Sequence, residues 1–376
     1  MSNLDNAFRS LFEINMGIAS GETVLVFSDR IRQDEAPSES DRDRRLRLNE
    51  TARRAAGFAS DTYGSGQFVD FPATTASGVE PPQMLWEATF GRSIMSGLQK
   101  GGILDDLLDK CITPEQLTKA REIVAAKAAD VPRIIIAMSN NSTSHTNYRK
   151  LACHAGARFA SLPHFDPDMF GSSMNVDWNA LADRTARLVA AVNRAEWVNV
   201  ECPNGTAMHI CKRGRDAGGD DGLLTKPGCF GNLPAGEAYL APLEGESHGV
   251  MVIEWGPTRK LESPLSLIIA DGRVLRIDGD DPLRAVLEAR FAENDNCRNL
   301  AELGIGTNDK ASRPDNVLEA EKILGTIHLA LGDNTGFGGV VAAPFHEDYV
   351  FYRPTLTAIL ADGSEQLIID DGRMLV

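Results

Sequence analysis

The sequence has too few residues of several kinds to support whole classes of function. Six cysteines in 376 residues are too sparse for a disulfide framework, and no two of them form a CxxC pair of the zinc-ribbon or thioredoxin type. Basic residues are also in the minority, because 38 Lys and Arg stand against 53 Asp and Glu, for a formal net charge of −15. Nucleic acids and anionic membranes both favour basic surfaces, so neither is an expected partner.

Long apolar segments are also missing. The longest runs, such as residues 134–138, have the length of a strand, whereas a membrane-spanning helix needs about 20 apolar residues. The N-terminus shows no basic stretch followed by an apolar one, so it does not resemble a secretory signal. We therefore expect a soluble, cytoplasmic protein.

Several common catalytic motifs are absent as well. The sequence contains no GxxxxGK[ST] phosphate loop, no HExxH zinc helix, no GxSxG nucleophile elbow and no GxGxxG after the first expected strand. The nearest glycine-rich stretch, residues 226–236, is interrupted by two prolines. These absences argue against mainstream nucleotide enzymes and serine hydrolases.

What the sequence does contain divides into two parts at about residue 195. The first part alternates apolar strands, such as 22–27, with helical patterns, such as the amphipathic segment 178–194. This alternation predicts an open α/β sheet. The second part has short strands separated by Gly- and Asp-rich turns, including two Asp-Gly hairpin signals. We expect an N-terminal α/β domain over residues 1–195 and a β-rich α+β metal-binding domain over residues 196–376.

The candidate site residues are isolated polar residues within apolar segments of the second part. His346 and Asp348 are two apart in an expected strand, so both side chains face the same side. Glu237, Glu302 and His328 each interrupt an apolar stretch, where an unpaired buried carboxylate costs on the order of several kcal/mol. Each residue alone has an ordinary explanation as a turn acid, a helix-start acid or a core histidine. Together they favour a shared metal site.

Four segments carry a resemblance to a known family. NLPAGEAYLAP, NLAELGIGTN, ILGTIHLALGDN and PFHEDY resemble, in the same order, consecutive motifs of the thermophilic metalloprotease family, the aminopeptidases of T and S type. The opening stretch NMGIASGETVLVFSD resembles the start of that family's N-terminal domain. The resemblance implies an α/β N-terminal domain, a C-terminal catalytic domain and a homodimer. It also implies two metal ions, held by Glu237, Glu302, His328, His346 and Asp348.

The chain departs from these peptidases at one position that matters for catalysis. They carry an active-site tyrosine a few residues beyond the histidine of the HLALG segment, and residues 333–339 contain no tyrosine. Tyr349 or Tyr352 could take its position in space. The chain is also shorter than the peptidases between Glu302 and His346.

The same superfamily contains a different chemistry. The 2,5-dihydroxypyridine 5,6-dioxygenases resemble this fold but bind one Fe(II) through two histidines and one aspartate. They have a histidine at the position matching Glu302 and no acid at the position matching Glu237. An iron site in this chain would therefore use His328, His346 and Asp348.

Because both acids are present, the sequence favours the dinuclear hydrolase pattern. We expect a metal-dependent hydrolase of the aminopeptidase T-like type that cleaves an amide or peptide bond with a metal-activated water. Glu302 is the expected proton relay, and Glu237 is the second catalytic carboxylate. The ligands suit one or two ions of zinc, cobalt or manganese. The alternative is a mononuclear Fe(II) ring-cleaving dioxygenase acting on a hydroxylated pyridine or similar aromatic. The expected partners are a small-molecule or peptide substrate and a second copy of the chain.

Overall fold

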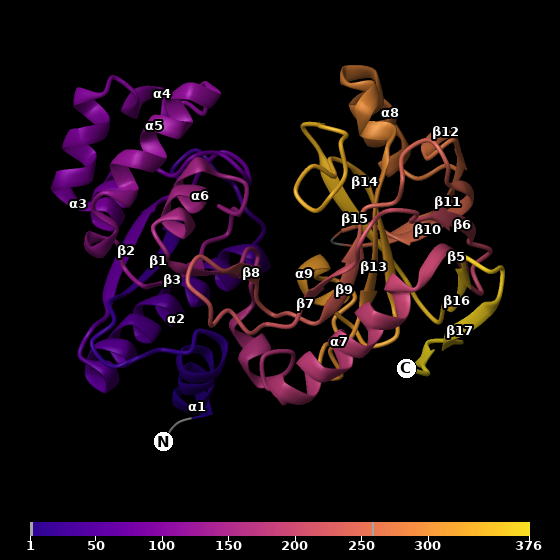
Figure 1. The fold of residues 1–376 in the computed structure, drawn as a ribbon, viewed down its shortest axis with the longest axis horizontal. Helices are drawn as coiled ribbons and strands as arrows, with labels where there is room; N and C mark the ends of the chain where they lie inside the picture. Colours follow the sequence, from indigo (N-terminus) through magenta and orange to yellow (C-terminus); the bar gives the residue numbers. More distant parts are fainter. Residues whose placement is uncertain (1–2, 258) are drawn as a thin grey trace. The chain divides into compact units, whose positions relative to one another are not determined.

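The computed structural model describes residues 3–257 and 259–376 and divides the chain into two compact units (Figure 1). The first unit comprises Met1–Asn175 and Gly222–Pro234, and the second comprises Val176–Asp221 and Ala235–Val376. The division expected near residue 195 thus falls before helix α7 (Trp178–Asn193) rather than after it. The reason is that α7 buries its apolar side, including Leu188 and Val192, in the core of the second unit.

The first unit contains an open parallel sheet with helical connections, as the α/β alternation predicts. The sheet has the order β2-β1-β3-β4-β8. Its strands are β1 (Val24–Arg30), β2 (Gln67–Pro72), β3 (Ile134–Met138), β4 (Arg158–Ser161) and β8 (Phe230–Asn232). The helices are α1 (Asn3–Ser10), α2 (Glu39–Tyr63), α3 (Gln83–Lys100), α4 (Leu104–Leu108), α5 (Pro114–Ala125) and α6 (Asn147–His154).

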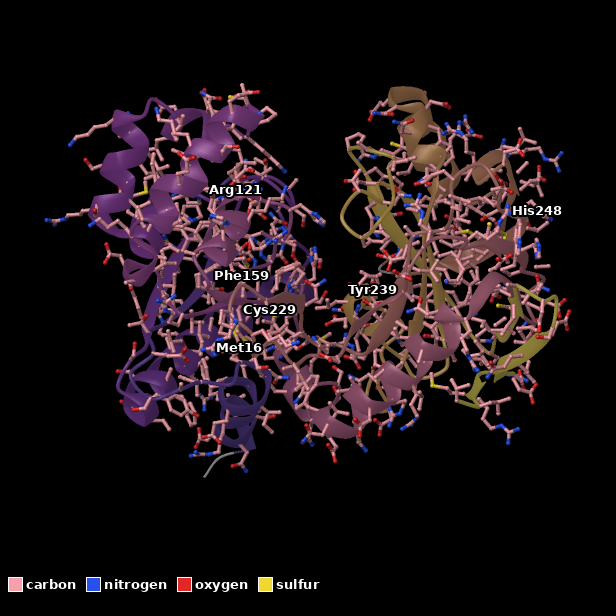
Figure 2. The ribbon with its side chains drawn as sticks, viewed as in Figure 1. Met16, Arg121, Phe159, Cys229, Tyr239 and His248 are labelled. Carbon is pink, nitrogen blue, oxygen red and sulfur yellow. The ribbon has the colours of Figure 1, made fainter. Side chains whose placement is uncertain are left out.

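Apolar runs form the centre of this sheet because both of its faces are covered. Every residue of β3 is buried, and Phe159 of β4, labelled in Figure 2, packs edge-on against Phe27 of β1. Continuous apolar strands of this kind are typical of parallel sheets. At the start of helix α5, Thr113 and Gln116 form a reciprocal capping box, and Pro114 lies between them in the first turn.

The second unit contains two antiparallel sheets that enclose one core. The larger has the order β12-β11-β10-β6-β5-β16-β17-β18, and the smaller has the order β15-β14-β13-β9-β7. The strands of the larger sheet are β5 (Ala195–Glu201), β6 (Ala207–Cys211), β10 (His248–Trp255), β11 (Lys260–Ala270), β12 (Arg273–Asp278), β16 (Thr355–Leu360), β17 (Glu365–Asp370) and β18 (Arg373–Met374). Those of the smaller sheet are β7 (Gly218–Asp220), β9 (Glu237–Leu240), β13 (Leu300–Gly306), β14 (Ile327–Gly332) and β15 (His346–Phe351).

Both expected hairpins are present in the larger sheet. Asp271 and Gly272, which join β11 to β12, have φ values of 50° and 66°, the positive values that a tight hairpin turn needs. Helix α8 (Leu283–Glu293) packs on the core, and the short helix α9 (Val317–Ala320) precedes β14. Within the described ranges, no helix combines the length and apolar character needed to cross a membrane.

Candidate metal centre

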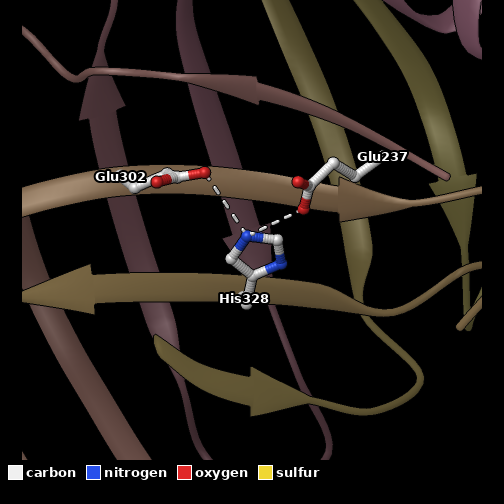
Figure 3. Close-up of side chains that lie close together, drawn as sticks. All are labelled: Glu237, Glu302 and His328. Atoms are coloured by element: carbon white, nitrogen blue, oxygen red, sulfur yellow. Dashed lines mark ion pairs between the residues drawn. The ribbon is translucent and has the colours of Figure 1, made fainter. Parts of the chain in front are cut away.

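The smaller sheet of the second unit brings all five sequence-predicted site residues to one of its faces. In the antiparallel register, Glu302 of β13 lies opposite Ala330 of β14, which in turn lies opposite Asp348 of β15. His346 pairs with a glycine of β14 two residues further along. Because alternate residues of a strand share a face, His328 lies on the same side as Ala330. Figure 3 shows Glu302 and Glu237 approaching the His328 ring from either side.

The opposite face of these strands is apolar, which explains why the acids interrupt hydrophobic runs. Leu303 and Ile305 of β13 and Leu329 and Leu331 of β14 are almost completely buried and belong to the core of the second unit. This alternation directs the intervening polar side chains away from the core. The apolar face therefore fixes the register that brings the polar residues together.

A glycine makes room for the central histidine. Gly304 of β13 lies opposite His328 of β14, and a Cβ atom at Gly304 would lie 2.0 Å from both Cε1 and Nε2 of the imidazole ring. A real Cβ does not approach other atoms so closely. The His328 ring therefore lies directly over the Gly304 backbone, with its Nε2 atom toward the acids.

The distances between the polar atoms suit a metal ion. His328 Nε2 lies 3.3 Å from Glu237 Oε2, 3.5 Å from Glu302 Oε1 and 4.0 Å from Asp348 Oδ1. His346 Nε2 lies 3.4 Å from Glu302 Oε2 and 3.5 Å from Asp348 Oδ1. Ligands bonded at about 2.0–2.2 Å to one tetrahedral or octahedral ion are about 3.0–3.5 Å apart. The ligand atoms of Glu302, His346 and Asp348 all lie within 4.8 Å of one another, as do those of Glu237, Glu302 and His328, so each group is spaced like ligands around one ion.

Two further observations fit a bound cation. His346 Nδ1 is 2.7 Å from the carbonyl oxygen of Asp333. Donation to that oxygen leaves the lone pair on Nε2, which faces the acids. In the described part of the chain, the buried atoms Glu237 Oε2 and Asp348 Oδ1 have no hydrogen-bond partner. Buried carboxylate oxygens without a donor are stabilised by positive charge.

The electrostatics of the site also call for positive charge. Burial alone would lower the pKa of His328, but the hydrogen bond with Glu302 and the charges of Glu237 and Asp348 outweigh it and raise the pKa to about 9. Burial opposes ionisation of Asp348, yet the charge of His346 lowers the pKa of this carboxyl. The carboxylates thus attract protons to the imidazoles, and a metal ion can supply the same positive charge.

Two buried charged residues beside the site, Lys322 and Glu321, are not among the residues predicted from the sequence. The Lys322 side chain is 1% exposed, and its ammonium group bonds to Glu237 and lies 2.8 Å from Glu321 Oε1. Burial raises the pKa of Glu321 to about 8. In the sequence the pair reads EAEKILG, which resembles a solvated charged turn, so no local signal identifies it.

The tyrosine near the site is Tyr239, and neither of the two expected candidates takes this position. Tyr349 points into the apolar core, and its hydroxyl donates to Glu347 Oε1 at 2.5 Å. Tyr352 packs its ring against Trp255. Tyr239, labelled in Figure 2, lies opposite Gly304 and hence on the face of the sheet that carries the acids.

An aromatic wall adjoins the candidate ligands. The rings of Tyr239 and Phe337 meet edge to face with centroids 6.1 Å apart, and Phe337 meets the His346 ring at 5.8 Å. Both aromatic side chains are half-buried, and the His346 side chain is 27% exposed. The site is therefore open to solvent on the side where His346 and these rings lie.

The fold and the site together define a two-unit protein with a candidate metal centre on an antiparallel sheet. A comparison with protein-family models shows to which family this chain belongs. Residues 109–376, more than two thirds of the chain, match the model of the NicX family, described as 2,5-dihydroxypyridine 5,6-dioxygenase, and the chain belongs to this family. No curated protein was found to match.

Two solved structures share the fold. A 2,5-dihydroxypyridine dioxygenase from Pseudomonas putida KT2440 has 16% identity and a TM-score of 0.69, covering 100% of this chain and 98% of its own. AmpT from Thermus thermophilus has 15% identity and a TM-score of 0.60, covering 100% of this chain and 99% of its own. The predicted superfamily and the predicted α/β fold with a β-rich second part are thereby confirmed.

Proposed function

We propose that this protein is a mononuclear Fe(II) dioxygenase that opens the ring of a hydroxylated pyridine or a related aromatic compound. The observation that carries the proposal is the family match over residues 109–376, which includes every candidate ligand. This was the alternative expectation from the sequence. The comparisons support it better than the hydrolase, because the matching family model is that of a dioxygenase.

Three of the candidate ligands offer the donor types that one iron ion with open coordination positions would need. His328, His346 and Asp348 supply two imidazoles and one carboxylate, the set that non-haem Fe(II) oxygenases use. Both Nε2 atoms face Asp348 Oδ1, at 4.0 and 3.5 Å. A ferrous ion held there would supply the redox chemistry that lets dioxygen react with an aromatic ring.

The other residues of the site would act on the substrate. A flat ring beside His346 would contact Tyr239 and Phe337, whose faces and edges favour aromatic partners. The Glu302 carboxylate touches both histidines, at 3.5 and 3.4 Å, and its pKa is lowered despite burial by their hydrogen bonds. An ionised Glu302 is suited to accept the proton of a substrate hydroxyl group.

The test is oxygen-dependent ring cleavage by protein purified without oxygen and loaded with Fe(II). With 2,5-dihydroxypyridine or a related hydroxypyridine, we expect oxygen consumption, loss of the aromatic absorbance and a product that contains both atoms of labelled dioxygen. Iron-loaded protein that consumes no oxygen with any hydroxylated pyridine or benzene would contradict the proposal.

A matched set of variants connects the activity to the proposed ligands. His346→Ala and Asp348→Asn should lose both iron and activity, because each removes one of three iron ligands. Glu347→Gln is the control, because Glu347 lies between them on the strand and faces the other side. This variant should retain iron and turnover.

Amide hydrolysis is the second candidate function. It is favoured by the two acids Glu237 and Glu302, which lie on the same face as the histidines, as the aminopeptidase resemblance requires. Protein loaded with zinc, cobalt or manganese should then release the chromophore from aminoacyl p-nitroanilides, whereas the dioxygenase should not. The homodimer and the cytoplasmic location stay predictions, tested by sedimentation and by cell fractionation.

A further inference from the structure

The buried Lys322 ammonium contacts Glu237, a carboxylate that the second ion of a two-metal site would use. Two-metal centres hold their ions about 3.5–4 Å apart and share ligands between them. One group of closely spaced ligand atoms consists of Glu302, His346 and Asp348, a second of Glu237, Glu302 and His328, and a third of Glu321, His328 and Asp348. The Lys322 ammonium bonds to the Glu237 carboxylate of that second group.

The chain holds Lys322 at this position through its backbone. Asn308 donates its N–H to the Lys322 carbonyl oxygen at 2.8 Å, so the segment is fixed to the residues that follow β13. A Cβ atom at Gly306 would lie 2.1 Å from the Ile323 carbonyl oxygen and 2.9 Å from the Lys322 carbonyl carbon. Gly306 pairs with Glu237, so this close approach brings the lysine beside that acid.

The two Glu237 oxygens have different surroundings. One oxygen accepts a bond from Lys322, and the other faces His328 Nε2 at 3.3 Å. The same ammonium lies 2.8 Å from Glu321. A second divalent ion bound by Glu237 would therefore compete with an ammonium group that already contacts both Glu237 and Glu321.

We propose that the buried Lys322 ammonium substitutes for a second metal ion and limits this centre to one divalent ion. The lysine thereby makes a mononuclear site from a set of acids and histidines that could otherwise hold two ions. The inference rests on the metal centre of the proposed function but not on the reaction that the centre performs.

The test is the metal stoichiometry of purified protein titrated with Mn²⁺ and, separately, with Zn²⁺. Wild-type protein should bind one ion per chain, and Lys322→Met should bind two, as measured by calorimetry and elemental analysis. Electron paramagnetic resonance should show isolated Mn²⁺ in the wild type and a spin-coupled pair in Lys322→Met. Lys322→Arg keeps the charge and should bind one ion, as should Lys310→Met, which removes an exposed lysine.

The failure of this inference and the failure of the proposed function give different results. Wild-type protein that binds two ions overturns the role of Lys322 whether or not any variant folds. A folded Lys322→Met variant that still binds one ion overturns it as well. A wild type that binds one ion but cleaves no ring, with a Lys322→Met variant that binds two, contradicts the dioxygenase and supports the role of Lys322. A wild type that binds no ion contradicts both.

Discussion

Replacing Gly304 by alanine should disable the metal centre while leaving every candidate ligand in the sequence. The added Cβ atom would lie 2.0 Å from Cε1 and Nε2 of His328, whereas ordinary contacts begin at 3.4 Å. The ring must therefore move by about 1.4 Å. Because metal–nitrogen bonds are about 2.0–2.1 Å long and tolerate little change, His328 cannot remain a ligand after such a shift.

The loss of the His328 ligand determines the expected fall in metal affinity, and the crowding at residue 304 determines the expected fall in stability. Disturbing only the partners of metal ligands typically weakens metal binding 10–100-fold, so the loss of His328 should weaken it by about 100-fold or more. Overpacking a buried site costs about 1–3 kcal/mol, which corresponds to a fall of several degrees in Tm for a unit of this size. Chelator competition gives the affinity, and thermal unfolding gives the stability.

A glycine elsewhere in the chain provides the control. Gly57 lies within helix α2, with no atom within 4 Å of an added Cβ. Gly57→Ala should therefore leave metal binding unchanged and raise stability slightly, by about 0.4–1 kcal/mol. If Gly304→Ala bound metal as tightly as the wild type, the position assigned to the His328 ring would be refuted.

Three further predictions concern stability and substrate binding. Asp281 accepts hydrogen bonds from Arg259, which lower the pKa of the Asp281 carboxyl to about 2. The contribution of this ion pair to the free energy of unfolding is therefore complete above pH 3.8 and is lost as the pH falls towards 2. Asp281→Asn should cost about 2–3 kcal/mol at pH 6 in urea unfolding and much less near pH 2; an equal loss at both would contradict this. Removing metal with a chelator should lower the Tm, and divalent ion at about 1,000 times its Kd should restore about 4 kcal/mol; an unchanged Tm would contradict metal binding. Phe337→Ala should raise the KM for an aromatic substrate by about tenfold with little change in kcat, whereas an unchanged KM would exclude ring contact.

The residues of the site that could be predicted from sequence are those whose position follows from a local rule. His346 and Asp348 are two apart in one strand, and the two-residue period of a strand gives both the same face. Glu302 and His328 were found because each is a polar residue in a strand whose other face is core. These inferences need no knowledge of which strands are neighbours.

The remaining site residues depend on contacts between distant segments. Tyr239 reaches the site only through the pairing of β9 with β13, and Phe337 only through the loop after β14. Lys322 depends on the close packing of residues 322–323 against Gly306. The division between the units was likewise displaced, since α7 has an ordinary amphipathic pattern that does not reveal which core it covers.

The segment Gly222–Pro234 belongs to the first unit although it follows part of the second unit in the sequence, and this order has a consequence for biosynthesis. Strand β8 pairs with the edge strand β4, which ends at Ser161. During translation about 70 further residues must therefore be synthesised before β8 can cover the exposed edge of β4. An unpaired parallel strand is a site of aggregation. A fragment that stops at Asn175 would keep that edge open permanently, and a fragment that starts at Val176 would carry β8 without its sheet. Either half expressed alone should therefore be less soluble than the whole chain.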